Sequence, residues 1–481
     1  MRVDGTKDAV VGEGGEIVYA AVTDGFVTVD VSNPDDPRVL TERRELLSED
    51  DAGPMELVWD TAVDGDRLAV AAPAYAAGNV PQGVLLYDVS DPADPVRVAF
   101  HETEAPVHNC DLDDGFLYLT GNDMRDNAAV VVDVRDDDPE EVSRFSPVDY
   151  DETWGELPPQ TRVIHDVVVE GGIAYCPFWN AGTWLFDVSD PSDPEKRGIA
   201  GGYTAEAHID LPTSQYRHSG LEPPGNHHYA TPGDDGAIMA VNTESWRVDD
   251  SEYGGPGGIT LWDVTDPTCP DHLSTIEPIY PVDATRGGIW TTAHNFELVG
   301  DRLYSSWYQD GVRIHDVSDP GNPVELTHWR DPDDASFWTA RLARAGECFI
   351  AADHSVSDEG SPESDHVEGA GIYVFPDAAG EQIAQPEIPT REPPAEWSLE
   401  PPIEERATCS TPSTPTRTPS PPPSTPTRTP SPTPTDSPRP AADSPRPAAD
   451  STDEETPGFG LPGAIVALGG ATYAAWRRTG E

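Results

Sequence analysis

Lysine is almost absent from this chain of 481 residues: only Lys7 and Lys196 occur, and arginine supplies the rest of the 29 basic residues. Against them stand 88 acidic residues, which give a formal net charge of −59. So much carboxylate repels phosphate, which argues against binding to nucleic acid. The 12 Trp, 15 Tyr and 11 Phe exceed what a disordered chain carries. The combination is typical of a folded halophilic protein, because concentrated salt screens charges beyond about 3 Å.

The chain also lacks any pair of cysteines in a CxxC spacing, which argues against a zinc ribbon or a redox motif. We expect buried free thiols, which pack as small apolar groups. A disulfide is the alternative in an exported protein, and the sequence does not pair the cysteines. The five are Cys110, Cys176, Cys269, Cys348 and Cys409.

Recognised catalytic signatures are missing as well. The sequence contains no GxSxG, P-loop, HExxH, dinucleotide fingerprint or intact EF-hand loop. Acidic pairs occur throughout, so they nominate no glycosidase. We therefore nominate no catalytic residue, and the sequence favours a binding or structural role.

The repeat is the strongest internal signal. Asp-Val-(Ser/Thr)-(Asp/Asn)-Pro-x-x-Pro follows a short apolar run, and the run predicts a strand because it is rich in β-branched and aromatic residues. Ser189 and Asp190 illustrate the turn that follows, since both can bond to downstream backbone. The prolines then end the strand. Full copies occupy residues 30–37, 88–95, 187–194, 263–270 and 316–323, a degenerate copy lies at 133–136, and the strand at 371–376 lacks the Asp.

Upstream of each copy lies a further pair of strands joined by a glycine-containing turn. Three strands plus a looser fourth, repeated without an amphipathic helix between them, predict an all-β fold: a seven-bladed β-propeller of four-stranded antiparallel blades. A β-solenoid is the alternative, and the uneven repeat length disfavours it. The predicted units are 8–45, 57–100, 107–147, 163–200, 226–277, 292–330 and 337–377.

These motifs resemble the LVIVD-repeat family of bacterial and archaeal surface proteins. The run at residues 85–92, Leu-Leu-Tyr-Asp-Val-Ser-Asp-Pro, carries the likeness best, and the resemblance spans most of residues 8–377. It implies a propeller at a cell surface. It implies no activity, because the family is defined by its repeat.

Two segments follow the predicted propeller domain, residues 1–380. Residues 381–456 are rich in Pro, Ser and Thr and predict a disordered linker or stalk, extended by about 3.1 Å per residue where proline dominates. Residues 457–481 carry an apolar stretch that predicts a C-terminal helix or membrane anchor, followed by a basic pair suited to a cytoplasmic end.

The last segment resembles the PGF-type sorting signal of archaeal surface proteins. Pro457, Gly458 and Phe459 precede the apolar stretch, and Arg477 and Arg478 follow it. The resemblance implies processing by an archaeosortase-like enzyme, replacement of the tail by a lipid, and anchoring at the outer face of the cell membrane. The given chain starts without an apolar leader, so we expect its true start, with a signal peptide, to lie upstream.

One set of recurring side chains consists of residues that commonly bind metal ions. Near the start of four units a histidine recurs beside a polar residue, and equivalent positions in a propeller lie at the same radius and height. We therefore expect four imidazoles to converge on the central channel, where they would form a candidate cluster for a transition metal of unknown identity. The candidate ligands are His108, His165, His228 and His294, supported by Asn109, Asp166, His227 and Asn295.

Packing is the alternative explanation, since a copied repeat copies its structural residues too. Trp59 and Trp338 stand near the analogous place in two other units, which suits a packing role. The sequence thus leaves two functions open. One is a surface-anchored binding or structural module of the archaeal envelope, with a protein or glycan ligand; the other is a metal-binding protein or metal-dependent extracellular enzyme.

Two further groups of histidines occur in long loops. The insertion of the fifth unit carries His208 and His218 beside His227 and His228, and the seventh unit carries His354 and His366. Such loops often shape the binding face of a scaffold. A solvated loop is the favoured explanation, so the sequence assigns them no role.

Overall fold

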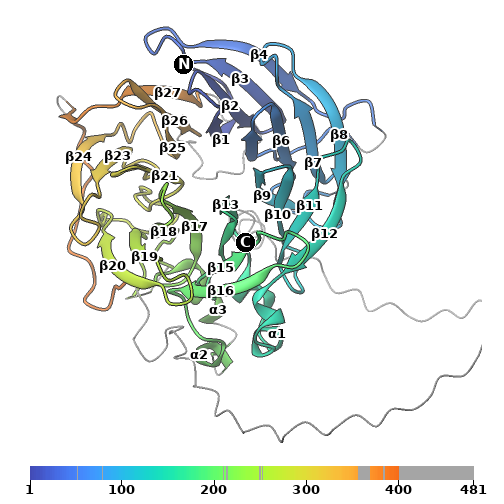
Figure 1. The fold of residues 1–481 in the computed structure, drawn as a ribbon. Helices are drawn as coiled ribbons and strands as arrows, with labels where there is room; N and C mark the ends of the chain where they lie inside the picture. The colour runs from blue at the N-terminus through green and yellow to red at the C-terminus, as the bar shows by residue number, and fades with distance from the viewer. Residues whose placement is uncertain are drawn as a thin grey trace, which may run out of the picture. The chain divides into compact units, whose positions relative to one another are not determined.

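Seven antiparallel sheets surround a common axis in the computed structural model (Figure 1). The structure describes residues 1–399 except 51–52, 79, 210, 213–214, 249–250, 252, 356–368 and 383–384. The architecture confirms the predicted seven-bladed β-propeller. The predicted anchor at 457–481 and the predicted linker from residue 400 lie outside the described residues. Among the described residues, the structure shows no helix with the length and apolar character needed to cross a membrane.

The first three blades are regular four-stranded sheets in sequence order, and the first strand of each lies nearest the axis (Figure 1). Blade one consists of β1 (Thr6–Val11), β2 (Ile17–Val22), β3 (Gly25–Asp30) and β4 (Arg38–Arg44). Blade two consists of β5 (Asp60–Asp64), β6 (Arg67–Ala72), β7 (Gly83–Asp88) and β8 (Val96–Glu102). Blade three consists of β9 (Val107–Asp113), β10 (Phe116–Gly121), β11 (Ala128–Asp133) and β12 (Glu140–Phe145).

Blades four to six repeat the pattern, and blade seven has three named strands. Blade four consists of β13 (Val168–Glu170), β14 (Ile173–Pro177), β15 (Thr183–Asp187) and β16 (Glu195–Ala200). Blade five consists of β17 (His227–Pro232), β18 (Ile238–Thr243), β19 (Ile259–Asp263) and β20 (Asp271–Ile276). Blade six consists of β21 (Phe296–Val299), β22 (Arg302–Ser306), β23 (Val312–Asp316) and β24 (Val324–Trp329), and blade seven of β25 (Phe337–Arg344), β26 (Cys348–Asp353) and β27 (Gly371–Pro376).

Each pair of neighbouring blades shares one apolar core. Strands such as β7 are buried on both faces, because each sheet packs between two others. The core between blades one and seven, for example, joins Val18 and Val27 to Ile350 and Ile372, all fully buried. Burying each such side chain contributes about 1.5–3 kcal/mol. The alternating apolar runs of the sequence therefore fill seven interfaces rather than one central core.

The repeated turns are held by their aspartates. The first Asp of each copy accepts a backbone hydrogen bond two residues on, as Asp187 does from the Ser189 N–H at 3.0 Å, and Asp190 repeats the arrangement with Ser192. The acceptor in the first turn is thus Asp187 rather than Ser189, which we expected to turn the chain. The hydrogen bond from Arg197, together with those from Ser189, holds the pKa of Asp187 at about 2.

The ring closes between its first and last blades through main-chain bonds. The Val3 N–H donates to the Ala370 carbonyl at 2.9 Å, and the Ile372 N–H donates to the Met1 carbonyl at 3.0 Å. Residues 1–3 therefore pair with β27 and complete the outer edge of blade seven. The sequence predicted a fourth strand for this blade without locating it.

The chain continues past the last blade across its neighbours. β28 (Gly380–Glu381) pairs with β24 of blade six in parallel. Further on, the Val282 N–H donates to the Pro389 carbonyl at 2.9 Å, and the Trp397 and Tyr280 rings lie edge to face with centroids 5.7 Å apart. These contacts extend the folded unit at least to residue 399, beyond the boundary at residue 380 that the sequence predicts.

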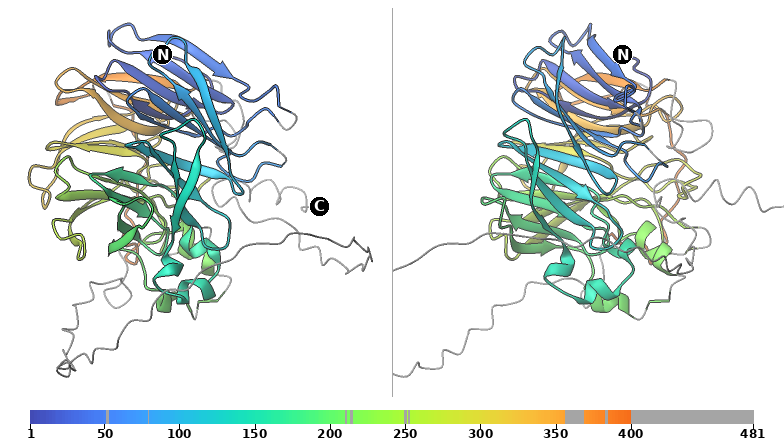
Figure 2. Two further views of the ribbon diagram at one scale, coloured as in Figure 1. Left: turned by 45° about the vertical axis from the view of Figure 1, so that its right-hand side comes forward. Right: turned by 90° about the vertical axis from the view of Figure 1, so that its right-hand side faces the viewer.

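Short helices occur only beside blade four within the described residues, and they lie outside the ring of sheets (Figure 2). They are η1 (Pro147–Asp149), α1 (Thr153–Glu156), η2 (Pro159–Arg162), α2 (Ala205–Ile209) and α3 (Tyr216–Leu221). Of the cysteines, Cys110, Cys176 and Cys348 are buried free thiols, whereas Cys269 takes part in a disulfide.

The closure generates a first prediction, at Gly371. A Cβ built at Gly371 would lie 2.1 Å from the Met1 carbonyl oxygen, which is backbone and cannot rotate away. We expect Gly371→Ala to lower the free energy of unfolding by about 1–3 kcal/mol, the usual cost of overpacking. Denaturant unfolding in concentrated salt measures it. Gly380→Ala is the control, because nothing lies within 4 Å of its Cβ, and equal stability of the two variants would contradict the prediction.

A second prediction concerns pH. Asp353 is fully buried at the end of β26, and burial raises its pKa to about 7. A raised folded-state pKa costs stability as pH rises from about 4 to 7, because the unfolded chain ionises first. We expect Asp353→Asn to match the parent near pH 4 and to exceed it by about 1–3 kcal/mol at pH 8. Unfolding at both pH values tests this, and a difference that does not widen with pH would contradict it.

Candidate functional site

Seven side chains, one from each blade, form a closed circle around the axis. We call them the axial ring: Lys7, Trp59, His108, His165, His228, His294 and Trp338. Each lies at or just before the start of the innermost strand of its blade.

The contacts of the axial ring run from blade to blade without a break. Along the four histidines, neighbouring ring centroids lie close together: 4.4 Å for His108–His165, 3.6 Å for His165–His228, 4.5 Å for His228–His294 and 4.3 Å for His294–Trp338. On the other side the Trp59 ring lies 5.7 Å from the His108 ring, and the Lys7 ammonium lies 5.1 and 5.4 Å from the Trp59 and Trp338 rings. The structure thus brings the four predicted histidines together in one consecutive arc.

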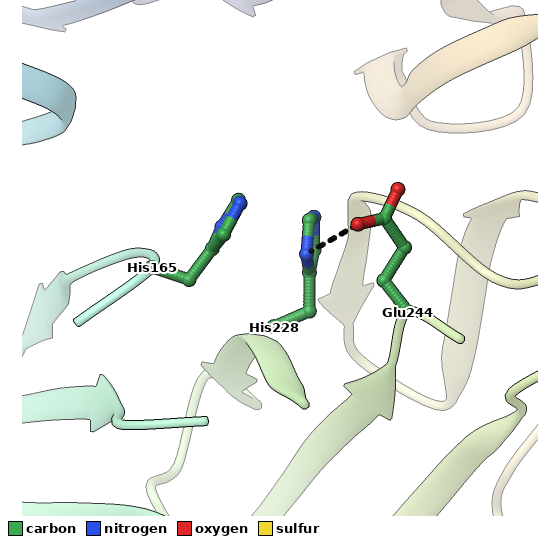
Figure 3. A group of neighbouring side chains, drawn as sticks. All are labelled: His165, His228 and Glu244. Atoms are coloured by element: carbon green, nitrogen blue, oxygen red, sulfur yellow. Dashed lines mark ion pairs between the residues drawn. The ribbon is translucent and has the colours of Figure 1, made fainter. Parts of the chain in front are cut away.

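Glu244 joins this arc from a loop that follows β18. Its Oε2 lies 3.2 Å from His228 Nδ1, as Figure 3 shows, and its Oε1 lies 4.0 Å from His294 Nε2. His228 Nε2 in turn lies 3.0 Å from His294 Nε2. His165, His228 and Glu244 each contribute one donor atom, and these three atoms lie within 4.8 Å of one another.

Burial sets the protonation of these groups. Burial lowers the pKa of His294 to about 3 and that of His108 to about 4, and it lowers the pKa of His165 well below its usual value. For Glu244 burial alone would raise the pKa, but His228, His294 and Tyr308 outweigh it and hold the pKa at about 2. Neutral imidazoles beside an ionised carboxylate are the forms that bind metal ions.

Tyr308 holds the Glu244 carboxylate through a hydrogen bond. Its hydroxyl donates to Glu244 Oε1 at 2.5 Å, and burial raises the pKa of Tyr308 well above its usual value, so the proton stays in place. The Tyr308 ring packs edge to face on His294 and Trp290, at centroid distances of 4.9 and 5.0 Å. The aromatic surroundings therefore hold both the carboxylate and one imidazole in position.

The residues that directly follow the axial ring form a second layer along the axis. The Asn109 amide donates to Asp166 Oδ2 at 2.5 Å, which links blades three and four. Asn295 is buried, and its Oδ1 has no hydrogen-bond partner among the described residues. Burial raises the pKa values of Asp8 and Asp60, the matching residues of blades one and two.

His227 does not join the arc although it precedes His228. Its Nδ1 lies 3.0 Å from the Thr183 hydroxyl of blade four, because neighbouring residues of a strand point to opposite faces. Of the loop histidines, His354 packs against Trp338 with ring centroids 5.3 Å apart, His366 lies outside the described residues, and the other two lie apart from the arc. His208 Nε2 lies 3.0 Å from the Asn180 amide, whereas His218 faces Glu222 at 3.5 Å.

Sequence reasoning missed three members of the site. Lys7 followed by Asp8 repeats the pattern of His165 and Asp166 at the start of a unit, so a signal existed for it. Glu244 and Tyr308 lie in loops between strands of the fifth and sixth units, and the Asp-Val motif does not include these loops. The metal role of the four histidines stays a prediction.

Comparison with known proteins finds a known repeat in two segments of the chain. A family model described as "LVIVD repeat" matches residues 14–41 and 162–199, which contain the strands β2 and β3 of blade one and most of blade four. No curated protein matches the chain.

Several solved structures are similar to this chain at low sequence identity. The β-propeller domain of Cps50 (Swd1) from Myceliophteria thermophila is 12% identical, with 78% of this chain and 98% of that chain covered and a TM-score of 0.48. A functionally unknown protein from Desulfotomaculum acetoxidans is 9% identical, with 66% and 84% covered and a TM-score of 0.44. The computationally designed Ika8 protein is 9% identical, with 78% and 97% covered and a TM-score of 0.44. The chain is thus a seven-bladed β-propeller in which two segments match the LVIVD repeat.

Proposed function

We propose that this protein binds a divalent transition metal on the propeller axis. The observation that carries the proposal is the convergence of His165, His228 and Glu244, whose donor atoms lie within 4.8 Å of one another. His294 lies next to this set, since its Nε2 is 3.0 Å from His228 Nε2 and 4.0 Å from Glu244 Oε1. Donors that share a metal at about 2.0–2.2 Å lie roughly 3 Å apart, so small side-chain rotations complete the site.

The donor set selects the class of metal. Imidazole nitrogens suit zinc, iron, copper and nickel, whereas calcium and magnesium prefer oxygen ligands alone. Two imidazoles with one carboxylate hold catalytic zinc in some hydrolases and ferrous iron in some oxygenases, with positions left open for a further ligand. Zinc or ferrous iron are therefore the metals that we expect first.

Two further features support the proposal. His165 Nδ1 is buried and has no hydrogen-bond partner in the part of the chain that the structure describes. A buried polar atom of this kind calls for an explanation, and an ion that binds the ring supplies one. Tyr308 orients Glu244 through its hydrogen bond, as outer partners commonly do for metal ligands.

We also propose that the propeller works at a cell surface as a binding module of the archaeal envelope. This part rests on the sequence of residues 457–481 and on the Ser/Thr/Pro-rich stretch before it. An archaeosortase-like enzyme would process the tail, and the membrane or an attached lipid would anchor the protein. A metal on the axis then gives the module a site for a small ligand, in addition to any protein or glycan bound on its loops.

The metal proposal predicts a stoichiometry. The full chain, purified in multimolar salt and exposed to equal amounts of zinc, ferrous, copper and nickel ions, should retain about one metal per chain. His228→Ala should reduce the retained metal below about a tenth, because it removes the central donor, and Glu244→Gln should weaken binding by about 10–100-fold. Elemental analysis after gel filtration measures both.

A matched control lies one residue away. His227→Gln changes a buried histidine of the same strand whose ring faces Thr183, so it should retain metal as the parent does. Circular dichroism shows whether each variant keeps the fold. If the parent retains no transition metal, or if the His227 and His228 variants lose it equally, the proposal fails.

The surface proposal predicts a change of location. When the gene is expressed in a halophilic archaeal host, the full chain should fractionate with membranes, and a chain ending at residue 456 should appear in the medium. Immunoblots of both fractions measure the distribution. Retention of the truncated chain inside cells, or release of the full chain, would count against surface anchoring.

A further inference from the structure

We propose that residues 380–399, the docked segment, hold the two loops that carry Glu244 and His294 in the conformation that the metal site needs. The inference rests on the proposed metal function and adds regulation to it, because metal affinity then depends on whether the segment is docked. The Glu244 loop, residues 244–258, joins β18 to β19, and the His294 loop, residues 277–295, joins β20 to β21.

The two loops are bonded to each other directly beside the two donors. The Thr292 hydroxyl oxygen accepts hydrogen bonds from the backbone N–H groups of Ser245 at 3.2 Å and Gly257 at 3.0 Å. The Ala293 N–H donates to the Gly257 carbonyl at 3.0 Å. Ser245 and Ala293 are the immediate sequence neighbours of the two donors, so a shift of either loop moves a donor.

Tyr280 of the His294 loop connects the docked segment to the Glu244 loop. Its hydroxyl donates to the Gly254 carbonyl of the Glu244 loop at 2.7 Å. On the other side, the Arg391 guanidinium of the docked segment lies over the Tyr280 ring, and the Arg391 N–H donates to the Tyr280 carbonyl at 3.1 Å. The buried Tyr280 side chain therefore contacts one loop through its hydroxyl and the docked segment through its ring.

Trp397 of the docked segment packs against both loops. Its ring lies edge to face with that of Tyr280, with centroids 5.7 Å apart, and its Nε1 would lie 2.8 Å from a Cβ built at Gly255. The glycine thus lets the docked segment lie directly on the Glu244 loop. The Gly255 carbonyl in turn accepts a hydrogen bond from the Ser245 hydroxyl at 3.1 Å. The contacts of Trp397 therefore reach the residue next to Glu244 in two steps.

The propeller closes without the docked segment. Residues 1–3 pair with β27 to complete the ring, and Ile388 is the only buried residue among the described residues of the segment. A segment held by few buried contacts detaches at a lower free-energy cost than global unfolding. When the segment is detached, metal binding has to order the two loops, and the entropy cost of that ordering lowers the affinity.

Hydrogen exchange on the metal-free full chain tests the hold on the loops. Trp397→Ala should speed exchange of the backbone amides in both loops by at least about fivefold, since couplings between distant sites are typically about 5–150-fold. Trp397→Phe keeps an aromatic ring beside Tyr280 and should stay within about twofold of the parent. Mass spectrometry of the peptides that span the two loops measures the rates in multimolar salt.

Zinc affinity measures the consequence for the metal site. Trp397→Ala should weaken zinc binding by at least about fivefold, and Trp397→Phe should keep most of the affinity. Trp397 is not itself a donor, so a loss of affinity reports the positioning of Glu244 and His294. Calorimetric titration of the full chain with zinc, in the same salt, measures the dissociation constant of each variant.

Gln385→Ala is the matched control. It changes the same docked segment where it crosses blade six, because the Gln385 amide donates to the His328 carbonyl at 3.5 Å. Loop exchange and zinc affinity should therefore equal those of the parent. Equal exchange rates in the Trp397→Ala and Gln385→Ala variants would overturn the inference.

The inference and the proposed metal function fail in different ways. A parent that retains no metal, with faster loop exchange in Trp397→Ala, overturns the metal site and leaves the hold on the loops standing. Equal zinc affinity in the parent and in Trp397→Ala leaves the metal site standing and overturns the inference. If Trp397→Ala does not fold, Tyr280→Phe decides, because it removes the hydroxyl that bonds to the Gly254 carbonyl. Unchanged exchange in the Glu244 loop of that variant would overturn the inference.

Discussion

Closure of the ring is the constraint on which the axis depends. Seven sheets share seven apolar cores, and the last of these exists only when residues 1–3 pair with β27. An open ring would leave one core exposed and would let the inner strands spread. The closed ring instead brings seven side chains from distant parts of the sequence into one circle. The site is therefore a product of the whole fold, and Lys7 reaches Trp338 across 331 positions because the ends of the propeller meet.

The ionisation of the titratable groups differs between the outer turns and the axis of the propeller. The repeated turns keep carboxylates such as Asp187 partly exposed, ionised and bonded to their own backbone. Along the axis the reverse holds. Burial lowers the pKa values of His108, His165 and His294 and raises those of Asp8 and Asp60, and Glu244 stays ionised because its neighbours stabilise the charge. The same residue type thus supports solubility outside and polar chemistry inside.

Much of this arrangement could be predicted from the sequence, because a repeat encodes its own geometry. The spacing of the Asp-Val copies predicted seven blades, and the position of each histidine within its unit predicted that four imidazoles would meet. Glu244 and Tyr308 could not be found in this way, since they lie in loops that the Asp-Val motif does not include. Residues 1–3 as the closing strand were equally hidden, because pairing between chain ends depends on the completed ring rather than on local pattern.

The path of the chain after blade seven has a mechanical consequence. Residues 380–399 cross blades six and five, where Arg330 Nε donates to the Pro386 carbonyl at 2.7 Å and Arg391 stacks over Tyr280. A pull on the chain beyond them is borne first by these contacts. The force reaches β27, which pairs with residues 1–3 to close the ring, only after these contacts break. The docked segment would therefore carry a pulling force before the main-chain bonds that close the ring do.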